Sequence, residues 1–366
     1  MLELKRKELG LQERLTNRTF QFDERYKDGY FSASYFLKTE KIIKDEFPET
    51  IVTMQWFTRK KARVCGIDES IALLHTFARS PENLRIEALN DGDYVEPWEP
   101  VLKVHGRYQD FGYLEGSIDG ILARRTSVCT NCDEVMKAKS SQSNVMFFGD
   151  RDDDPRNHPG DGYAAYVAGI KLVCTDAMGE WTGQKGIGTM PHALIVMHEM
   201  DLIKASEDFH KTFPEDNLTI LVDTNNDVIN DTLLVARHFK EKLWGVRIDT
   251  SISLEDKYFE RNPVNDPNVE THGVNVTLVK ALRKALDDEN FHHVKIVVSS
   301  GFTAEKVALF TKENAPVDTY GIGGSLIKCT RSFTGDVVNI NGKAMAKVGR
   351  KEMFSKRLKA VNYPIQ

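Results

Sequence analysis

Two glycine-rich segments of the sequence have the composition of phosphate-binding loops. One segment runs from Tyr320 to Ser325 and places three glycines after an apolar stretch, and the other runs from Val298 to Phe302. Glycine lets backbone N–H groups approach a phosphate without interference from a Cβ atom. A tight turn that requires glycine explains either segment alone. Two consecutive segments favour phosphate, because the last two strand-end loops of a barrel often form such a site.

Charged residues alternate with apolar ones near the end of another apolar stretch. Arg247 and Asp249 fall on one face of the segment 245–250, and Asp223 ends the similar segment 221–224. Buried charges are costly unless they meet each other or a ligand, so both a structural ion pair and a binding site stay open. Two carboxylates that face one pocket would suit ribose hydroxyls or a developing cationic sugar carbon.

A small-residue turn precedes an apolar helix in the segment 186–195. Pro191 is suited to the start of this helix and leaves His192 near its N-terminus. A lone histidine beside an apolar helix is more often a hydrogen-bonded structural residue than a catalyst. The nearby glycines, Thr189 and the helix start together would also present the imidazole to a phosphate.

The segment 146–151 ends a predicted strand with an aromatic residue, a glycine and an arginine. Phe148 would stack on a planar ring, and Arg151 would bind phosphate or carboxylate in a bidentate manner. The acidic run 152–154 follows. It is interpreted as a solvated loop, because metal sites rarely take all their ligands from adjacent residues.

Alternating strands and helices position these residues from about Ser143 onward. Such alternation predicts a parallel sheet, with the polar residues at the carboxyl ends of its strands. A barrel is the preferred closure, and an open doubly wound sheet stays possible. The predicted strands cover 144–148, 218–222, 244–248, 294–298 and 319–322, and the predicted helices cover 163–173, 227–239, 274–286 and 303–311.

The first third of the chain predicts a mixture of helices and strands. Apolar spacing predicts a helix over 30–47, and β-branched and aromatic residues predict a strand over 51–64. A further helix is expected over 67–78, where acidic residues open it, and a strand over 101–105. This region therefore has a different architecture from the rest of the chain.

Composition limits the class of protein. The chain has 366 residues, which predicts two or slightly more domains at roughly 150 residues each, and its net charge is −5. That charge argues against a protein whose main partner is nucleic acid or an anionic membrane. The absence of a long apolar segment or a secretory signal leads us to expect a soluble, cytoplasmic protein. The five cysteines include a lone CxxC at Cys129 and Cys132, interpreted as two reduced thiols on a helix.

Taken together, six motifs resemble the nicotinate phosphoribosyltransferase family in order and spacing. They are FFGDR, GTMPHALI, LVDT, GVRIDT, SSGF and YGIGGSLI, and the resemblance runs from about Asp28 to Leu326. It implies an enzyme of NAD biosynthesis that forms nicotinate mononucleotide and pyrophosphate from nicotinate and phosphoribosyl pyrophosphate. ATP hydrolysis through a phosphohistidine accompanies this glycosyltransferase reaction in the family, which makes the enzyme formally a ligase.

The resemblance also implies a fold and an assembly. The expected fold is α/β, an irregular TIM-like (β/α) barrel with a smaller α/β domain. Residues 1–125 would form that smaller domain, completed by 330–366, and residues 126–329 would form the barrel. The family usually forms homodimers with shared active sites. The expected partners are therefore small-molecule substrates and a second copy of the chain.

Residue roles follow from the resemblance motif by motif. His192 resembles the phosphorylated histidine, while Phe148 and the partner copy's Tyr30 resemble the two faces that hold the base. Arg151 resembles the arginine that binds phosphate or carboxylate, and Arg247 and Asp249 resemble residues beside the base and the ribose. Ser300 and Gly301 match the loop that binds the ribose, and Gly323 and Gly324 match the loop that binds the phosphate. Asp223 is grouped with His192 and Asp249 as catalytic, and Thr189 with the substrate-binding residues. We expect Mg²⁺ to enter with the pyrophosphate and not in a protein cage.

The sequence departs from the family pattern at two positions. Asp152 stands where many relatives have a second arginine, and Thr250 follows Asp249 where others continue as DSGD. Nicotinamide and quinolinate therefore stay open as alternative bases, although quinolinate would call for more cationic residues than these motifs offer. A catalytically silent relative that binds nucleotides is the alternative from another class.

Overall fold

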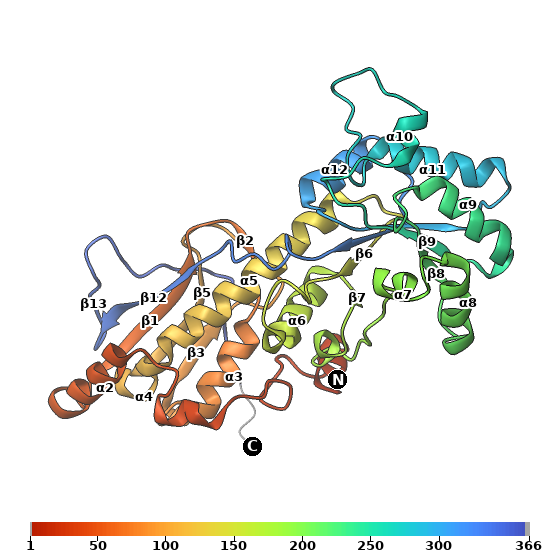
Figure 1. Ribbon diagram of the computed structural model, residues 1–366. Helices are drawn as coiled ribbons and strands as arrows, with labels where there is room; N and C mark the ends of the chain where they lie inside the picture. The colour runs from red at the N-terminus through yellow and green to blue at the C-terminus, as the bar shows by residue number, and fades with distance from the viewer. Residues whose placement is uncertain (1, 363–366) are drawn as a thin grey trace.

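The computed structural model describes residues 2–362 of the chain, which form two six-stranded sheets and one two-stranded sheet. Figure 1 shows an elongated molecule with an antiparallel sheet at one end and a parallel sheet at the other. Each six-stranded sheet has its own cluster of buried apolar side chains. No helix within residues 2–362 is long and apolar enough to cross a membrane.

The antiparallel sheet joins strands from both ends of the described chain. Its order is β13-β12-β1-β5-β3-β14, and these strands are β1 (Ile51–Thr58), β3 (Arg85–Ala88), β5 (Pro100–Arg107), β12 (Phe333–Ile340), β13 (Lys343–Ala344) and β14 (Lys359–Ala360). β1 pairs with both β5 and β12, and its Trp56 is completely buried. Residues far apart in sequence therefore share one core.

The single strand predicted over 51–64 is wrong in one respect. β1 ends at Thr58, and a separate strand, β2 (Ala62–Arg63), pairs with β4 (Tyr94–Val95). The three consecutive cations from Arg59 to Lys61 are exposed between β1 and β2. Their preference for solvent explains why the chain turns there.

Helices pack against the antiparallel sheet and connect it to the rest of the molecule. These are α2 (Ser34–Glu46), α3 (Ile67–Phe77), α4 (Tyr108–Phe111) and α5 (Glu115–Ala138). α3 begins after Gly66, whose φ of 95° favours glycine, and acidic residues occupy its first turn as the sequence predicted. The long helix α5 runs from the antiparallel sheet to the parallel one (Figure 1). Its Cys129 and Cys132 are free and buried, which confirms two thiols on a helix.

The second six-stranded sheet is parallel, as predicted. Its order is β7-β6-β11-β10-β9-β8, with β6 (Asn144–Phe147), β7 (Leu172–Val173), β8 (Thr219–Leu221), β9 (Gly245–Ile248), β10 (Lys295–Val298) and β11 (Thr319–Ile322). Five of these strands were predicted from the sequence, and β7 was not. An isolated parallel bridge between Val173 and Gly186 extends the sheet beyond β7. Closure of this sheet into a complete barrel stays a prediction.

Helices alternate with the parallel strands. They are α6 (His158–Ala168), α7 (His192–Met197), α8 (Leu202–Thr212), α9 (Val228–Phe239), α10 (Lys257–Arg261), α11 (Val276–Asp288) and α12 (Ala304–Lys312). The helix predicted over 163–173 is displaced: α6 begins earlier, with Pro159 in its first turn, and ends at Gly169, whose φ of 106° stops it. Residues 172 and 173 instead form β7.

Short 3-10 helices and one N-terminal helix complete the described chain. They are α1 (Leu2–Glu8), η1 (Glu24–Asp28), η2 (Pro81–Asn83), η3 (Gly112–Leu114), η4 (Pro155–Asn157), η5 (Ala177–Gly179) and η6 (Lys240–Lys242). The predicted domain boundary between residues 125 and 126 falls inside α5. The division of the chain into domains stays a prediction.

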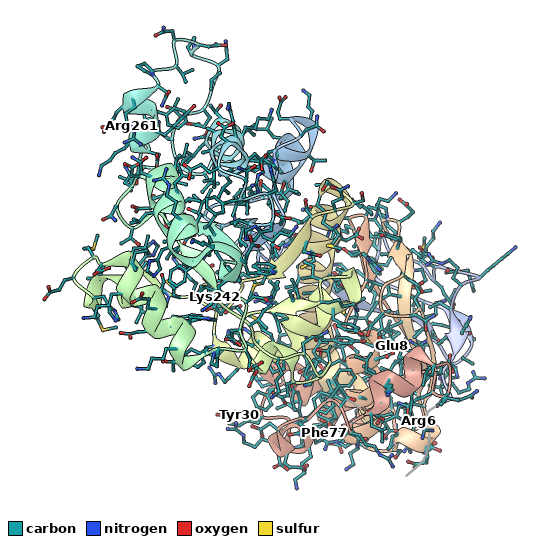
Figure 2. The ribbon with its side chains drawn as sticks, turned by 90° about the vertical axis from the view of Figure 1, so that its right-hand side faces the viewer. Arg6, Glu8, Tyr30, Phe77, Lys242 and Arg261 are labelled. Carbon is teal, nitrogen blue, oxygen red and sulfur yellow. The ribbon has the colours of Figure 1, made fainter. Side chains whose placement is uncertain are left out.

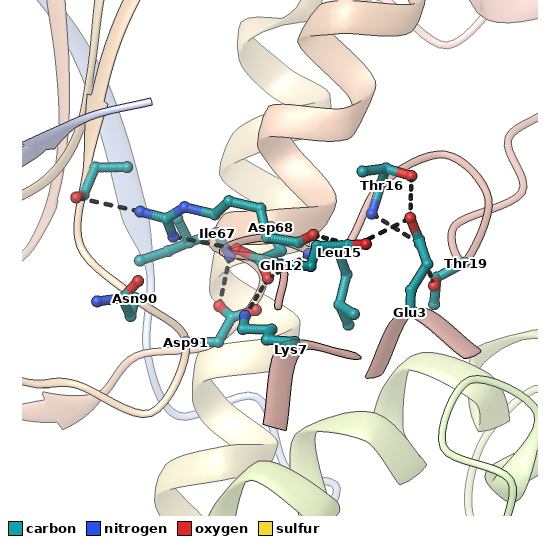
Figure 3. A network of polar contacts seen from close by, with 12 residues as sticks. Glu3, Lys7, Gln12, Leu15, Thr16, Thr19, Ile67, Asp68, Asn90 and Asp91 are labelled. Carbon is teal, nitrogen blue, oxygen red and sulfur yellow. Dashed lines mark hydrogen bonds and ion pairs between the residues drawn. The ribbon is translucent and has the colours of Figure 1, made fainter. Parts of the chain in front are cut away.

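A largely buried group of charges attaches the N-terminal segment to α3. This N-terminal ionic cluster consists of Lys7, Arg14, Asp68 and Asp91, and Figure 3 labels Lys7, Asp68 and Asp91. Asp68 is completely buried and pairs with Lys7 and, at 3.1 Å, with Arg14. The backbone N–H of Leu15 also donates to Asp68, at 3.0 Å. The cluster therefore holds in place the N-terminal segment, which does not belong to any sheet.

Candidate active site

The carboxyl ends of four parallel strands meet around one cavity of about 960 Å³. The strands are β6, β9, β10 and β11, which are neighbours in the sheet. This edge is where parallel α/β folds place their ligands. Eight of the residues predicted from the sequence line the cavity: Phe148, Arg151, Arg247, Asp249, Ser300, Gly301, Gly323 and Gly324.

Arg247 connects several parts of the site from β9. Its Nη2 donates to Asp249 Oδ2 at 2.9 Å, its Nε donates to Ser299 Oγ at 3.0 Å, and its Nη1 donates to Thr189 Oγ1 at 3.3 Å. Its Cζ lies 5.3 Å from the ring centroid of Phe148. The guanidinium is therefore held in one orientation between a carboxylate, two hydroxyls and an aromatic ring.

Asp249 is paired and still accessible from the cavity. Its Oδ1 accepts a hydrogen bond of 2.7 Å from Ser299 Oγ, while its Oδ2 accepts from Arg247. The side chain is 19% exposed, so its remaining lone pairs can accept from a ligand. The sequence allowed either an ion pair between Arg247 and Asp249 or a binding site. The structure has the ion pair, and the pair lies in the cavity wall.

The loop after β10 has a backbone that few residues adopt. Ser300 and Gly301 have φ angles of 73° and 66°. Positive φ is ordinary for glycine but strained for serine, and such strain is concentrated at ligand-binding sites. Both residues line the cavity.

The glycines in and just after β11 allow close packing and have no unusual φ angles. A Cβ at Gly321 would lie 2.6 Å from Phe148 Cε2, and a Cβ at Gly323 would lie 2.5 Å from the Phe148 carbonyl oxygen. A Cβ at Gly324 would lie 2.9 Å from Asp152 Oδ2. The glycines thus let the loops after β6 and β11 meet in the cavity wall.

His192 and Asp223 form a second pair on the neighbouring part of the sheet. His192 is the first residue of α7, and its Nε2 lies 3.2 Å from Asp223 Oδ1. The Asp223 side chain is 5% exposed and the His192 side chain is 45% exposed. Burial raises the pKa of Asp223, and Asp249 adds to this effect while His192 opposes it. Neither His192 nor Asp223 is among the residues that line the cavity, but Thr189 links their region to Arg247.

Tyr30 lies apart from the other predicted residues. It is 66% exposed, and the Cζ of Arg25 lies 4.4 Å from its ring centroid. Figure 2 shows it near Phe77, in the N-terminal half of the molecule. Within a single chain, Tyr30 does not line the cavity.

Four further residues of the cavity wall belong to the two glycine-rich segments predicted from the sequence, namely Ser299, Phe302, Gly321 and Ser325. The rest of the wall was not predicted to belong to the site: Arg124, Asp152, Asp153, Ser251, Thr303, Ile327 and Lys328. Arg124 comes from α5, donates to the carbonyl of Ile327 at 3.1 Å and pairs with Asp153 and Asp161. A helix in the middle of the chain carries no strand-end signal, so only the folded structure reveals its part in the site.

The donor chemistry of the cavity suits a hard cation that arrives with a substrate. Residues 2–362 contain no group of three histidine, cysteine or acidic side chains placed to hold a metal ion. Asp152, Asp153 and Asp249 nevertheless supply carboxylate oxygens to the wall. Such oxygens are compatible with Mg²⁺ that keeps several waters and is carried by phosphates.

Comparisons with known proteins agree with this geometry. The N-terminal domain model of quinolinate phosphoribosyl transferase matches residues 32–126. A nicotinate phosphoribosyltransferase of Mycobacterium tuberculosis is 24% identical over 259 residues, which cover 69% of this chain and 52% of the relative. The match therefore spans about half the length of that curated relative.

Two solved structures share the fold. A nicotinate-nucleotide pyrophosphorylase from Pyrococcus furiosus is 27% identical with a TM-score of 0.77, covering 91% of this chain and 80% of the other. A human nicotinic acid phosphoribosyltransferase has a TM-score of 0.64 at 16% identity, covering 86% of this chain and 75% of the other. The chain is thus similar in sequence to nicotinate phosphoribosyltransferases, and it shares the fold of the two solved structures.

Proposed function

We propose that the protein transfers a phosphoribosyl group to nicotinate. Nicotinate and phosphoribosyl pyrophosphate would give nicotinate mononucleotide and pyrophosphate, a step of NAD biosynthesis. The ring nitrogen bonds to the sugar C1 atom while the bond from C1 to pyrophosphate breaks, and the electron pair leaves with the pyrophosphate. The observation that carries the proposal is the convergence of an aromatic ring, an arginine–aspartate pair and two glycine loops in one cavity.

Phe148 and the arginines suit the base. A planar pyridine ring gains buried area and quadrupole attraction on the face of Phe148. Arg247 lies against the same ring and Arg151 lines the same cavity, so a guanidinium is within reach of a carboxylate carried by the base. Among the residues that the structure describes, Arg151 has no carboxylate partner of its own, which leaves it available to a ligand.

The loops and aspartates suit the sugar phosphate. Backbone N–H groups of Ser300–Gly301 and Gly323–Gly324 would hold the 5′-phosphate. Asp249 opens to the cavity, and Asp223 lies beside it on the neighbouring strand end. These two carboxylates would stabilise positive charge at the sugar carbon as the pyrophosphate leaves. Mg²⁺ bound to the pyrophosphate would neutralise charge on the leaving group, with the cavity carboxylates facing its waters.

His192 provides a test of ATP coupling. Asp223 holds Nε2, which leaves Nδ1 as the nitrogen that would accept the γ-phosphoryl group of ATP. Asparagine at this position keeps a hydrogen-bond donor but forms no stable phosphoryl adduct. We expect His192→Asn to lose ATP hydrolysis and ATP stimulation and to retain slow transfer without ATP. Full retention of ATP coupling in this variant would exclude the phosphohistidine.

Quinolinate is the second candidate base, because the quinolinate model matches residues 32–126. The cavity also contains two cations that the sequence motifs did not include, Arg124 and Lys328. Arg124 is already neutralised by Asp153 and Asp161, which favours the base with a single carboxylate. Nicotinamide, which has no carboxylate, would leave Arg151 without a partner in the cavity.

One assay distinguishes these functions. The chain is incubated with phosphoribosyl pyrophosphate, Mg²⁺ and nicotinate, nicotinamide or quinolinate, with and without ATP, and the mononucleotide is measured. We expect product from nicotinate, with a higher yield when ATP is present. Product from quinolinate alone would assign the second candidate, and no product from any base would indicate a catalytically silent relative.

We also propose that the protein forms a homodimer in the cytoplasm. The exposure of Tyr30 fits a side chain that enters the cavity of a second copy and covers the base opposite Phe148. Sedimentation of the purified chain tests the assembly. A monomer at assay concentration with full activity would contradict the shared site.

A further inference from the structure

Ser299 directly follows β10, and the proposed transfer gives its side chain no role. In the register of the parallel strands, Val297 of β10 pairs with Arg247 of β9. The backbone N–H of Ser299 continues this ladder by donating to the carbonyl of Ile248 at 2.9 Å. Side chains two positions apart lie on one face of a sheet, so Ser299 shares a face with Arg247 and Asp249.

The hydroxyl of Ser299 bridges these two charged side chains. Its Oγ donates to Asp249 Oδ1 at 2.7 Å and accepts from Arg247 Nε at 3.0 Å. The carbonyl oxygen of Ile248 lies farther from Oγ, at 3.4 Å, so the single hydroxyl proton is directed to the carboxylate. The donor and the acceptor role of the hydroxyl are therefore both filled within the Arg247–Asp249 pair.

A ligand in the cavity would meet the charged pair and not the Ser299 hydroxyl. Ser299 is 2% exposed, although it belongs to the cavity wall. The side chains of Arg247 and Asp249 are 16% and 19% exposed. The hydroxyl can thus affect a bound substrate only through the two side chains that it orients.

Removal of the hydroxyl would loosen both members of the pair. Arg247 would keep Asp249 Oδ2 at 2.9 Å and Thr189 Oγ1 at 3.3 Å, but its Nε would lose its acceptor. Asp249 would lose its donor at Oδ1 and could rotate about its remaining contact with Arg247. Charged groups stabilise a transition state best when their orientation is fixed before the reaction begins.

We propose that Ser299 is a positioning residue, which fixes Arg247 and Asp249 in the orientation that phosphoribosyl transfer requires. Ser299 directly precedes the Ser300–Gly301 loop, so the segment that would hold the 5′-phosphate also orients the two charges beside the base and the ribose. This inference rests on the proposed function for the reaction that Ser299 serves. The hydrogen bonds that it makes are independent of that function.

Steady-state kinetics of two substitutions test this role. We expect Ser299→Ala to lower kcat by about 10- to 100-fold, the range for misplaced groups at a reaction centre, and Ser299→Thr to restore most of it. The KM for phosphoribosyl pyrophosphate should change less than about twofold, because backbone N–H groups would hold its phosphate. A rise of this KM as large as the fall in kcat would mean that the loop itself is distorted, and would overturn the positioning role.

Ser143→Ala is the matched control. Ser143 directly precedes β6, at the edge of the same sheet away from the cavity, and it is 4% exposed. Its Oγ donates to the carbonyl of Val317 at 2.8 Å. The loss of this buried serine hydroxyl should leave kcat and KM unchanged. An equal fall of kcat in Ser143→Ala and Ser299→Ala would overturn the positioning role.

A double-mutant cycle shows whether Ser299 acts through the pair. In a chain that already carries Asp249→Asn, the further change Ser299→Ala should lower kcat by less than about threefold, because the carboxylate that Ser299 orients is already absent. Losses that multiply as if the two residues were independent would overturn the inference.

A measurement without turnover separates this inference from the proposed function. In NMR spectra of the full chain with isotope-labelled arginine, the Nε–H signal of Arg247 is assigned by its loss in Arg247→Lys. We expect this proton to exchange with water faster in Ser299→Ala than in Ser299→Thr, Ser143→Ala or the unaltered chain. This pattern in a chain that transfers to no base would overturn the proposed function and support the hold of Ser299 on Arg247. Active transfer with unchanged kcat and exchange in Ser299→Ala would overturn the positioning role alone.

Discussion

The protein contains two arginine–aspartate clusters that use the same chemistry in opposite surroundings. In the N-terminal ionic cluster, the side chains of Arg14 and Asp68 are 2% and 0% exposed. In the site cluster, formed by Arg247, Asp249, Asp223 and His192, the side chains of Arg247 and Asp249 are 16% and 19% exposed. The Arg14–Asp68 pair is closed to solvent, although Lys7 beside it is 21% exposed, whereas the Arg247–Asp249 pair faces a cavity.

The difference shows what each cluster can do. Both oxygens of Asp68 are occupied by Arg14, Lys7 and the backbone of Leu15, so no capacity is left for a ligand. Asp249 has only Arg247 and Ser299 and keeps accessible lone pairs. A closed ion pair holds segments together, whereas an open one can exchange solvent for substrate.

Removal of Asp68 should give the largest effect on stability. Asp68→Ala leaves Arg14 buried without its carboxylate, so we expect a loss of about 3–5 kcal/mol in the free energy of unfolding. Denaturant titration measures this loss. Asp23→Ala is the matched control, because Asp23 and Arg25 form an exposed pair at 2.6 Å whose removal should change the free energy of unfolding far less. Equal effects of the two substitutions would mean that the N-terminal ionic cluster does not fix the fold.

Removal of the charge at Asp249 should act on catalysis instead. Asp249→Asn keeps the shape of the side chain but weakens the hold on Arg247 and the stabilisation of positive charge. We expect kcat/KM for transfer to fall by about 10²- to 10³-fold, the range for one electrostatic group aimed at a transition state. Steady-state kinetics measure the fall, and Asp208→Asn, at an exposed aspartate of α8, serves as the control. Full turnover in Asp249→Asn would make the Arg247–Asp249 pair structural.

The pH dependence of stability should show the titration of Asp91 in the N-terminal ionic cluster. Burial, together with the charge of Asp68, raises the pKa of Asp91 to about 6, while Lys7 opposes this shift. The folded protein therefore keeps a proton that the unfolded chain loses near pH 4. Through Asp91, stability should fall as pH rises from about 4 to about 6, by roughly 3 kcal/mol at most. Burial also raises the pKa of Glu115 to about 8 and that of Asp119 to about 7, so these two groups extend the fall to higher pH.

Asp91→Asn tests this dependence. The amide carbonyl can still accept from the backbone N–H of Ile67, and the Tyr163 hydroxyl can accept from the amide instead of donating to the carboxylate. Unfolding titrations between pH 4 and pH 7 should then give a flatter profile than the unaltered chain. A profile that keeps its full slope would place the responsible proton elsewhere.

The sequence predicted what depends on local pattern. The parallel strands, the glycine loops and the placement of Arg247 with Asp249 all follow from alternation and from turn residues within a few positions. Contacts between distant residues were beyond such patterns. Arg14 and Asp68 are 54 positions apart, and Arg124 reaches the cavity from a helix, so only tertiary packing brings them to their partners.

The smallest expected effect concerns the ring of Phe148, which completes the open cluster. Phe148→Ala removes the surface on which the base would stack and the aromatic neighbour of Arg247. We expect the affinity for nicotinate to weaken by about 1–3 kcal/mol, the range for the loss of one stacking contact, with little change in unfolding. Equilibrium binding of nicotinate in the presence of pyrophosphate and Mg²⁺ measures this change.

A second aromatic ring provides the comparison. Phe354 is 84% exposed and has the Nζ of Lys103 at 4.6 Å from its centroid, so it has a cation beside its ring but no cavity. Phe354→Ala should leave nicotinate affinity unchanged. If Phe148→Ala and Phe354→Ala have the same effect on nicotinate affinity, the contact of Phe148 with Arg247 does not identify the binding site of the base. If only Phe148→Ala weakens binding, a contact between a cation and a ring contributes to binding of the base only where the ring faces the cavity.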